Sequence, residues 1–410
     1  GDTIDLYIEN NTDTSNITLE NFNQTIFKIS SSPTTFLFSP APPPPPDTSF
    51  TFTMITTNSG SASNTFVLPL VDDGTIDIEV DWGDSSTDTI TAYDQTEVTH
   101  VYSATGTYTI KMSGTIRGFQ VNNSGDKLKI LNISKWGDFN FTLPYTFYGC
   151  ENLTSDATDS PTISTTNLQY TFLICTNLEG GLSAWDVSSV TNMFGFLNGC
   201  QAFNDDLSLW QVGETTSMRD MFSTCLSFEG TGLSNWDVSK CENMDGMFNG
   251  ATDFSEDIGS WDTGECLTFY NMFRSPCKFN KDIGSWDTAK IQTIGAMFYW
   301  NTFFNQDIGN WDLGSCTNMW GAFNYATTFD QDLGGWDIAD VTELTNFLRG
   351  GTLSTANYDA LLLGWDAQSV QSGLNFHAGS STYTGGGAVA TARANLISSD
   401  SWTITDGGIA

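Results

Sequence analysis

The chain has 410 residues, enough for two or three domains, and it carries 48 acidic and 14 basic residues, for a net charge of -34 at pH 7. A field of this sign repels phosphate backbones and anionic lipid surfaces, so we expect no nucleic-acid partner. No apolar run approaches the roughly 20 residues of a membrane-spanning helix, so we expect no transmembrane segment.

Residues 1–39 are predicted to form a β-rich arm, because Ile4–Ile8 and Thr25–Ile29 alternate polar and apolar residues without a helical period. Residues 40–48 contain five consecutive prolines, which favour a stiff polyproline spacer of roughly 3.1 Å per residue. Two roles fit the arm: a disordered or decorative tail, and a docking strand that joins the sheet of a neighbouring subunit. The start at Gly1 rather than methionine fits either a removed signal peptide or a partial chain.

Residues 49–118 are predicted to form short strands at hairpin spacing, such as Ile76–Trp82 and Thr107–Met112. The stretch Val80-Asp81-Trp82-Gly83-Asp84-Ser85 is followed by Thr99–Tyr102 and Gly106–Ile110. Together these stretches resemble the PKD domain, an immunoglobulin-like β-sandwich of extracellular proteins. The resemblance implies a spacer or interaction module. Ser85 stands where that family has glycine, so we expect a slightly different turn.

From residue 147 to residue 353 one motif returns about every 25 residues. Its tryptophans are Trp185, Trp210, Trp236, Trp261, Trp286, Trp311 and Trp336. A period in the twenties is typical of a leucine-rich-repeat solenoid, in which each coil buries its apolar face against its neighbours. We therefore predict a mainly β fold with short helices: a cap and degenerate first coil at 119–160, a solenoid of about nine coils centred on 161–350, and a C-terminal cap at 351–410.

Each coil is predicted to hold a short helix and a short strand. Met193, Phe196, Leu197 and Cys200 fall at i, i+3, i+4 and i+7, as on one helix face, and residues 203–210 resemble a strand. Aspartate follows most of the tryptophans, where it can accept a hydrogen bond from the backbone N–H two residues on and close the corner. These aspartates are Asp186, Asp237, Asp262, Asp287, Asp312 and Asp337.

Stacked coils would align equivalent residues into ladders about 4.8 Å apart, the spacing of neighbouring strands. One ladder is Phe147, Phe172, Leu197, Phe222, Phe248, Phe273, Phe298, Phe323 and Phe347. Another is Leu153, Leu178, Phe203, Phe228, Phe254, Phe279, Phe304, Phe329 and Leu353. We expect both ladders to form the core.

Cysteines share two rung positions, one with Cys150, Cys175, Cys200 and Cys225, the other with Cys241, Cys266 and Cys316. They fit either small buried thiols, interchangeable with Ala251 and Ala326, or the disulfides Cys150–Cys175, Cys200–Cys225 and Cys241–Cys266. We expect thiols, because a disulfide here closes only a short loop between coils that packing already holds. None of the spacings resembles a zinc site.

Asp206, Asp257, Asp282, Asp307 and Asp332 stand four residues before a tryptophan. On consecutive rungs their charges would lie about 5 Å apart, which is costly without compensation. We expect backbone N–H groups to compensate them; the alternative is a row of calcium ions on Asp257, Asp282, Asp307 and Asp332.

Polar residues beside these aspartates vary between coils, as in either a ligand face or a solvated surface. They are Asp205, Glu229, Glu256, Lys281, Gln306 and Asp330. N-glycosylation motifs begin at Asn10, Asn16, Asn23, Asn122, Asn132, Asn140 and Asn152. Sugars there would coat the arm and the first coils and leave the repeats bare; chance occurrence in an Asn- and Thr-rich chain is the alternative.

Residues 50–410 resemble the BspA-like leucine-rich-repeat surface proteins. The likeness runs from Phe52 through Trp136–Asp138, Phe147–Cys150 and the Trp-Asp repeats. Leu353–Trp365 resembles the terminal helix of that family, and Trp402–Gly408 resembles its closing strand. The resemblance implies an extracellular or envelope-exposed protein used in adhesion or binding, and it identifies no ligand.

No catalytic residues are predicted. The two histidines, His100 and His377, fit packed or solvated positions, and no phosphate loop, nucleophile elbow, zinc-protease motif or EF-hand loop occurs. The carboxylates repeat with the fold instead of forming one asymmetric pair. We expect a non-enzymatic extracellular or cell- or virion-surface protein that binds a protein or glycan on another surface, or copies of itself. The alternative is a structural subunit of a fibre, filament or virion appendage, assembled through the arm and end-to-end stacking.

Overall fold

The computed structural model describes residues 47–410. This part of the chain is mainly β with few short helices, as predicted. Residues 48–410 form one compact unit, distinct from residues 1–47. The predicted β-rich arm at residues 1–39 and the prolines of the spacer lie outside the described residues.

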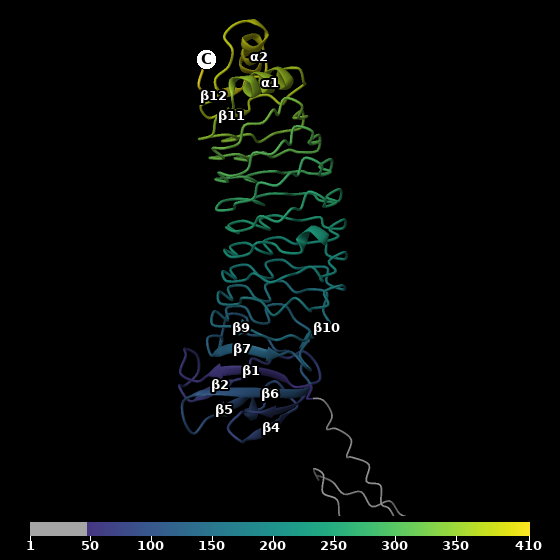
Figure 1. Cartoon of the computed structure of the whole chain (residues 1–410), viewed down its shortest axis with the longest axis vertical. Helices are drawn as coiled ribbons and strands as arrows, with labels where there is room; N and C mark the ends of the chain where they lie inside the picture. Colours follow the sequence, from purple (N-terminus) through teal and green to yellow (C-terminus); the bar gives the residue numbers. More distant parts are fainter. Residues whose placement is uncertain (1–46) are drawn as a thin grey trace, which may run out of the picture. The chain divides into compact units, whose positions relative to one another are not determined.

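A six-stranded sheet opens the unit (Figure 1), with strand order β4-β3-β6-β1-β7-β9. Its strands are β1 (Phe50–Ile55), β3 (Asp77–Asp81), β4 (Thr87–Ile90), β6 (Thr107–Thr115), β7 (Ile130–Lys135) and β9 (Thr154–Ser155). A separate pair joins β2 (Thr65–Val67) to β5 (Thr99–Val101), which follows the 3-10 turn η1 (Thr96–Val98). Because β1 pairs with both β6 and β7, the sheet continues past residue 118, where we expected the sandwich to end.

The turn between β3 and β4 keeps the conformation of a glycine turn although Ser85 occupies it. Ser85 has a φ of 75°, in the left-handed region that glycine adopts most easily. The carboxylate of Asp84 accepts hydrogen bonds from the N–H and the hydroxyl of Ser86, at 3.0 and 2.5 Å. The side chain of Asp84 thus fixes the turn.

From residue 140 to residue 350 the chain forms a stack of coils (Figure 1). The first coils pair β8 (Asn140–Phe141) with β10 (Thr162–Ile163), and later coils are joined by single parallel bridges. The bridged residues are Asn167, Asn192, Ser217, Asn243, Thr268, Thr293, Asn318 and Glu343. The 3-10 turn η2 (Leu233–Asn235) lies in the one coil whose tryptophans are 26 residues apart.

The rings that the 25-residue period places in register contact one another inside the stack. The centroids of Phe248 and Phe273 are 5.8 Å apart with 5° between the ring planes, and those of Trp261 and Trp286 are 6.4 Å apart, also at 5°. Both distances exceed the expected rung spacing. The indoles of six repeat tryptophans donate to backbone carbonyls at 2.8–3.1 Å; these are Trp210, Trp236, Trp261, Trp286, Trp311 and Trp336. The buried indole nitrogens of Trp136 and Trp185, at the start of the stack, have no hydrogen-bond partner.

The assignment of Phe347 to the ninth rung was wrong. The N–H of Phe298 donates to the carbonyl of Ala322, and the N–H of Phe323 donates to the carbonyl of Phe347, each at 2.8 Å. Phe347 therefore aligns with Ala322, and Leu348 aligns with Phe323. Phe347 and Leu348 are both buried, so residue type alone does not show which of them continues the ladder.

The short helix predicted at Met193–Cys200 was also wrong, since this segment forms successive turns. Gly195 and Gly199 have φ values of 58° and 81°, and a left-handed residue does not continue a right-handed helix. The four apolar side chains that suggested the helix are all buried. Two consecutive turns reproduce the helical spacing of buried residues without forming a helix.

The strand predicted at residues 203–210 does not form either. Asp205 accepts hydrogen bonds from the N–H groups of Leu182 and Ser183, at 2.8 and 3.0 Å, and Asp206 accepts one from Ser208 at 2.9 Å. Carboxylates thus satisfy backbone donors that a strand ladder would otherwise pair.

The aspartates after the tryptophans close the corners of the coils, as predicted. In each of the six, Oδ1 accepts a hydrogen bond from the backbone N–H two residues on, at 3.0–3.2 Å. This column is structural.

The C-terminal end of the stack is covered by α1 (Thr355–Asp366), α2 (Gly387–Ser398) and the parallel pair β11 (Asn375–His377) and β12 (Thr403–Thr405). A helix and a strand thus lie where the sequence resemblance placed them, and α2 was not predicted. Trp365 on α1 is fully buried, with its ring centroid 5.9 Å from that of Phe347 and 5.2 Å from that of Phe376. The cap thereby continues the aromatic core of the coils.

Candidate binding face

Each coil passes through a six-residue segment, and the outer side chains of these segments form what we call the turn face. The segments are residues 144–149, 169–174, 194–199, 219–224, 245–250, 270–275, 295–300, 320–325 and 345–350. The fourth residue of each segment is the core rung, such as Phe298, which is 1 % exposed. The second and sixth residues mostly have positive φ, as in Ala296 (53°) and Trp300 (59°).

Aromatic side chains of the turn face contact one another from coil to coil. Tyr299 lies with its ring centroid 6.0 Å from that of Trp320, and Trp300 lies 4.3 Å from Tyr325 with 19° between the planes. The guanidinium of Arg274 lies 4.8 Å from the ring centroid of Tyr299. Near the other end of the stack, Tyr170 contacts both Tyr145 and Phe194, and Arg219 lies over Phe194.

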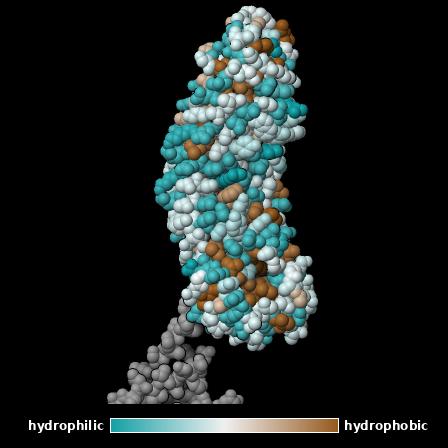
Figure 2. All heavy atoms as spheres, turned by 180° about the vertical axis from the view of Figure 1, so that it is seen from behind, coloured by the Kyte–Doolittle hydropathy of each residue, from teal (hydrophilic) through white to brown (hydrophobic). Residues whose placement is uncertain are grey.

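The turn face is poor in negative charge although the whole chain has a net charge of -34. Its nine segments contain two carboxylates, Asp220 and Asp245, and three arginines, Arg219, Arg274 and Arg349. Burial raises the pKa of Asp220, Arg219 lowers it, and the nearby Asp245 raises it further. Figure 2 shows one side of the unit, on which hydrophilic residues cover much of the stack and hydrophobic ones gather most toward the sheet.

The turn face is hard to find in the sequence because its aromatic residues occupy different positions of the segment in different coils. Tyr270 and Trp320 are first, Tyr299 is fifth, and Trp300 and Tyr325 are sixth. A repeat alignment by residue identity treats such positions as variable. The scarcity of carboxylates around the buried rung was the signal that could have revealed the face.

The six residues predicted as a ligand face do not form one column. Glu229 and Asp330 follow their ladder phenylalanine by one residue, whereas the other four follow theirs by two. Asp205 and Asp330 accept backbone hydrogen bonds, and Gln306 Nε2 donates to Asn280 Oδ1 at 2.9 Å. Glu229 and Lys281 are exposed and Glu256 is half-buried. Three of the six thus bind the stack itself.

Beside them, an asparagine ladder joins the coils. Asn280 Oδ1 accepts the N–H of Asn305 at 2.9 Å, and Asn305 Oδ1 accepts the N–H of Asp330 at 2.8 Å. Asp330 Oδ1 then accepts the N–H of Ser354 at 2.8 Å, at the start of α1. The repeated Phe-Asn pair in the sequence was the signal for this ladder.

The aspartates considered for calcium have backbone partners. Oδ1 of Asp257, Asp282, Asp307 and Asp332 each accepts the N–H of the glycine two residues on, at 2.8–3.0 Å. This is the compensation by backbone donors that we expected. Within residues 47–410, no group of three or more His, Cys, Asp or Glu side chains is arranged to hold a metal ion.

All eight cysteines are free and buried. Cys175, Cys200 and Cys225 each donate a hydrogen bond from Sγ to a backbone carbonyl 28 residues earlier, at 3.1–3.2 Å. Burial raises the pKa of the Cys241 and Cys277 thiols to about 12 and that of Cys316 to about 11. The thiols are therefore packing groups instead of nucleophiles.

Both histidines are structural. His100 stacks on Trp82 with ring centroids 4.6 Å apart, and its Nε2 lies 2.9 Å from Asp84 Oδ2. His377 Nδ1 accepts the N–H of Gly379 at 3.1 Å. Burial lowers the pKa of His377, and Arg349 lowers it further.

The glycosylation motifs differ in accessibility. Asn10, Asn16 and Asn23 lie outside the described residues. Asn132 and Asn152 use their Nδ2 groups in hydrogen bonds at 2.8 Å, and Oδ1 of Asn140 is buried. Asn122 is exposed, so it is the acceptor that the described structure leaves most accessible.

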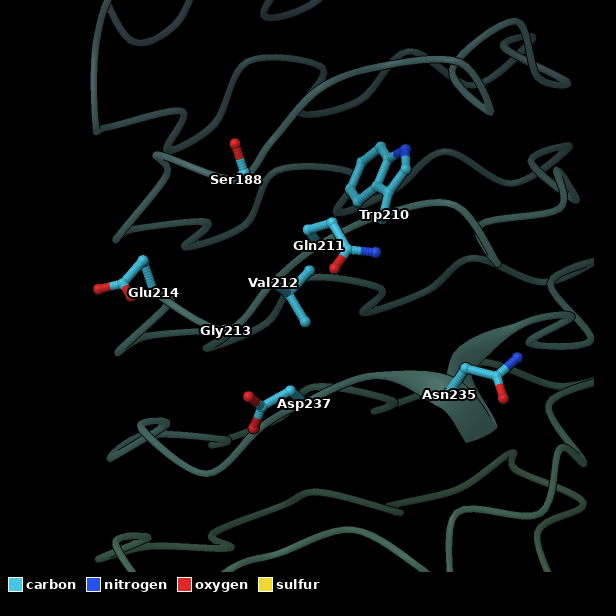
Figure 3. A pocket seen from close by; sticks show the side chains of 8 residues that line it. All are labelled: Ser188, Trp210, Gln211, Val212, Gly213, Glu214, Asn235 and Asp237. Atoms are coloured by element: carbon cyan, nitrogen blue, oxygen red, sulfur yellow. The ribbon is translucent and has the colours of Figure 1, made fainter.

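A polar hollow of about 230 Å³ opens where Gln211 interrupts the aspartate column (Figure 3). It is lined by Ser188, Trp210, Gln211, Val212, Gly213, Glu214, Asn235 and Asp237. Glu214 already pairs with Lys240 at 2.6 Å, and Asp237 accepts the N–H of Ser239 at 3.1 Å. Both carboxylates of the hollow thus already have a partner within the stack.

One known protein family matches the stack of coils. A family described as "Mycoplasma protein of unknown function, DUF285" matches residues 141–232, 216–336 and 278–383. The chain belongs to the DUF285 family. No curated protein and no solved structure shows a significant match.

The DUF285 matches together run from β8 through the coils, α1 and β11, and they leave β1 to β7 unmatched. The turn face of this DUF285 protein therefore lies wholly within the matched region. None of the helices in residues 47–410 has the length and apolar character needed to span a bilayer.

Proposed function

We propose that this DUF285 protein is a non-enzymatic surface protein that binds a partner through the turn face of a leucine-rich-repeat solenoid. The 25-residue register, the parallel bridges and the stacked rings support a solenoid of the BspA-like type. The six-stranded sheet and the β2–β5 pair support a PKD-like, immunoglobulin-like sandwich that precedes it.

The composition of the turn face carries this proposal. Aromatic residues and arginine are the side chains most enriched at binding hot spots, and charged carboxylates are depleted there. In a chain with 48 acidic residues, a face with two carboxylates and nine half-buried or exposed aromatic side chains is distinct from its surroundings.

A charge-reversal experiment tests the proposal. Beads coated with the full chain should attach to at least one of immobilised mucin, fibronectin, laminin or cultured epithelial cells. The triple change Arg219→Glu, Thr224→Glu and Arg349→Glu should abolish attachment. The matched triple change Lys240→Glu, Lys281→Glu and Lys290→Glu, at exposed positions outside the turn face, should preserve it. Equal attachment by both variants would refute the turn face as the binding surface.

The rival proposal is a structural subunit assembled through the arm and end-to-end stacking. Size-exclusion chromatography with light scattering should give the same monomer mass for the full chain and for residues 48–410 if the protein is a binding protein. Oligomers that form only with residues 1–47 would favour the structural subunit.

A further inference from the structure

We propose that Trp300 and Tyr325 form a stacking platform for an uncharged pyranose ring of a glycan, an inference that rests on the proposed binding role of the turn face. The two rings come from consecutive coils and lie nearly parallel, with centroids 4.3 Å apart and 19° between their planes. Trp300 is 47 % exposed, and it is the one exposed tryptophan in residues 47–410.

The backbone at the platform is unusual for residues of this size. Trp300 and Tyr325 have φ values of 59° and 58°, in the left-handed region that bulky residues rarely adopt. Four other coils place glycine at this sixth position: Gly149, Gly199, Gly250 and Gly350. Ile174 and Thr224 also occupy this position with positive φ, so the backbone conformation belongs to the coil. The platform is distinguished by its side chains, because two consecutive coils carry aromatic rings there.

The packing around Tyr325 holds its ring in place. A Cβ atom at Gly350 would collide with Cδ1 and Cε1 of Tyr325, so the ring lies directly over the backbone of the next coil. Trp300 in turn stacks on Tyr325, and its backbone N–H donates to the carbonyl of Asn324 at 2.7 Å. The two rings are thus already stacked without a ligand, which limits the entropy cost of binding.

The small size of the platform favours one sugar ring as the ligand over the larger surface of a protein partner. A stable protein interface buries about 800 Å² on each partner and has an apolar centre. The exposed large apolar side chains of this part of the stack are Trp300 and Phe303. Tyr325 covers one face of the Trp300 indole, so the exposed part of Trp300 is the surface on which a ligand can stack. One exposed indole with polar surroundings matches the apolar face of one sugar ring and its hydroxyl rim.

The charge around the platform favours an uncharged sugar. Segments 295–300, 320–325 and 345–350 contain no carboxylate and one arginine, Arg349. The net charge of -34 on the chain repels polyanionic glycans and nucleic acids at longer range. A neutral sugar carries no charge that would have to be desolvated, and the negative charge of the chain does not repel it.

A hydrogen-bond acceptor beside the platform has no partner. Asn324 precedes Tyr325, is 3 % exposed, and its Oδ1 accepts no hydrogen bond in the structure. Its side chain lies close to Gly321, as does the ring of Tyr299. This buried amide oxygen, one residue before Tyr325, is a group that a sugar hydroxyl would satisfy after a side-chain shift.

Glycine substitutions separate platform loss from unfolding. Trp300→Gly and Tyr325→Gly each place glycine where other coils already have it, so they relieve strain and remove a ring. Ile174→Gly is the matched control, because Ile174 is the sixth residue of a distant segment, is 40 % exposed and has a φ of 61°. All three variants should keep the melting temperature of the full chain or raise it.

Binding is measured by calorimetry on the full chain with neutral hexasaccharides of glucose, mannose, galactose and N-acetylglucosamine, and with heparin and gelatin as rival ligands. At least one neutral hexasaccharide should bind saturably and protect Trp300 from acrylamide quenching. Its Kd should rise at least ten-fold in Trp300→Gly and in Tyr325→Gly and stay within two-fold in Ile174→Gly. Binding of heparin or gelatin alone, binding of no hexasaccharide, or equal binding by all variants would overturn the inference.

The two hypotheses fail differently. Beads that attach through the turn face while no neutral sugar binds would leave the proposed function intact and remove only the glycan platform. Loss of sugar binding in Trp300→Gly together with unchanged bead attachment in the Arg219, Thr224 and Arg349 variant would support the platform and refute the wider role of the turn face.

Discussion

Asp220 is a carboxylate of the turn face, and its burial destabilises the ionised form of its side chain. Burial raises its pKa, Arg219 partly offsets this effect, and Asp245 in the next coil adds to it. Because the pKa of Asp220 is raised in the folded state, the protonated side chain stabilises the fold at low pH, and this contribution is lost as pH rises through the folded pKa. Asn271 fills the equivalent position with a φ of 58°, close to the 51° of Asp220. Asparagine should therefore fit there without strain.

We expect Asp220→Asn to raise the melting temperature at pH 7 by a few degrees, as a gain of about 1 kcal/mol does, and to change it little at pH 3. Asp237→Asn is the control with the opposite sign, because hydrogen bonds from Ser239 lower the pKa of Asp237. That control should lower the melting temperature at pH 7 and not at pH 3. Calorimetry at both pH values checks both variants, and a lower melting temperature of Asp220→Asn at pH 7 would contradict the argument.

Phe273 illustrates how much one rung contributes to a coil. Its ring lies 5.8 Å from that of Phe248 and 5.7 Å from that of Phe298, and it is fully buried. Phe273→Ala should lower the free energy of unfolding by about 3–5 kcal/mol, because a cavity opens between three coils. Phe303→Ala, at a side chain that is 48 % exposed, should cost far less. Urea unfolding measures both, and similar losses would mean that the ladder is not the main source of stability.

A buried ion pair lies beside the six-stranded sheet, next to the start of β7. Lys129 Nζ lies 3.4 Å from Asp126 Oδ1 and donates to the carbonyls of Ser61, Ala62 and Thr65 at 2.7–3.1 Å, with no exposed side-chain surface. It thus ties the loop before β2 to the start of β7.

We expect Lys129→Met to cost about 3–5 kcal/mol, because it leaves Asp126 buried without its cation. The exposed pair Lys240–Glu214 is the control, and Lys240→Met should cost about 1 kcal/mol or less. Chemical denaturation compares the two variants. A loss for Lys129→Met no larger than for the control would show that Asp126 is held by its other donors, the N–H groups of Ser61 and Val67.

At the level of elements, the sequence predicted which residues are buried better than it predicted the backbone between them. The 25-residue period depends on side chains that must meet in the core, so Phe273 and Trp286 could be placed from spacing alone. The helix at Met193–Cys200 could not be excluded, because two turns bury the same positions as a helix does. The turn face escaped prediction since its contacts join residues such as Arg274 and Tyr299, which share no identity between coils.

Across the whole molecule, stacking assigns a different chemistry to each side of the coils. Rings and thiols point inward, aspartates that bind backbone N–H groups form the corners, and aromatic residues with arginine form the turn face. Each side is built by repetition, so the contributions of equivalent residues to stability add along the stack. The eight buried thiols allow this sum to be measured.

Alkaline pH should destabilise the whole stack through these thiols. Burial raises the pKa of Cys316 to about 11 and of Cys241 and Cys277 to about 12, from the usual value of 9.0. The folded state thus keeps neutral thiols while the unfolded state ionises, so stability is complete below about pH 9 and is lost as pH rises toward the folded values. Each such thiol contributes a slope of about 1.4 kcal/mol per pH unit in that range.

The double change Cys200→Ala and Cys225→Ala tests this, because Ala251 and Ala326 occupy the equivalent position in other coils and are fully buried. Under reducing conditions, the free energy of unfolding of the unaltered chain should fall between pH 9 and pH 10 more steeply than that of the variant. Burial raises the pKa of both Cys200 and Cys225. The expected difference between pH 9 and pH 10 is about 2 kcal/mol from two thiols, because an unfolded thiol is only partly ionised at pH 9. Tyrosines such as Tyr358 are common to both proteins and cancel in the comparison. Equal slopes would mean that these thiols ionise in the folded state, and hence that water reaches the cysteine column.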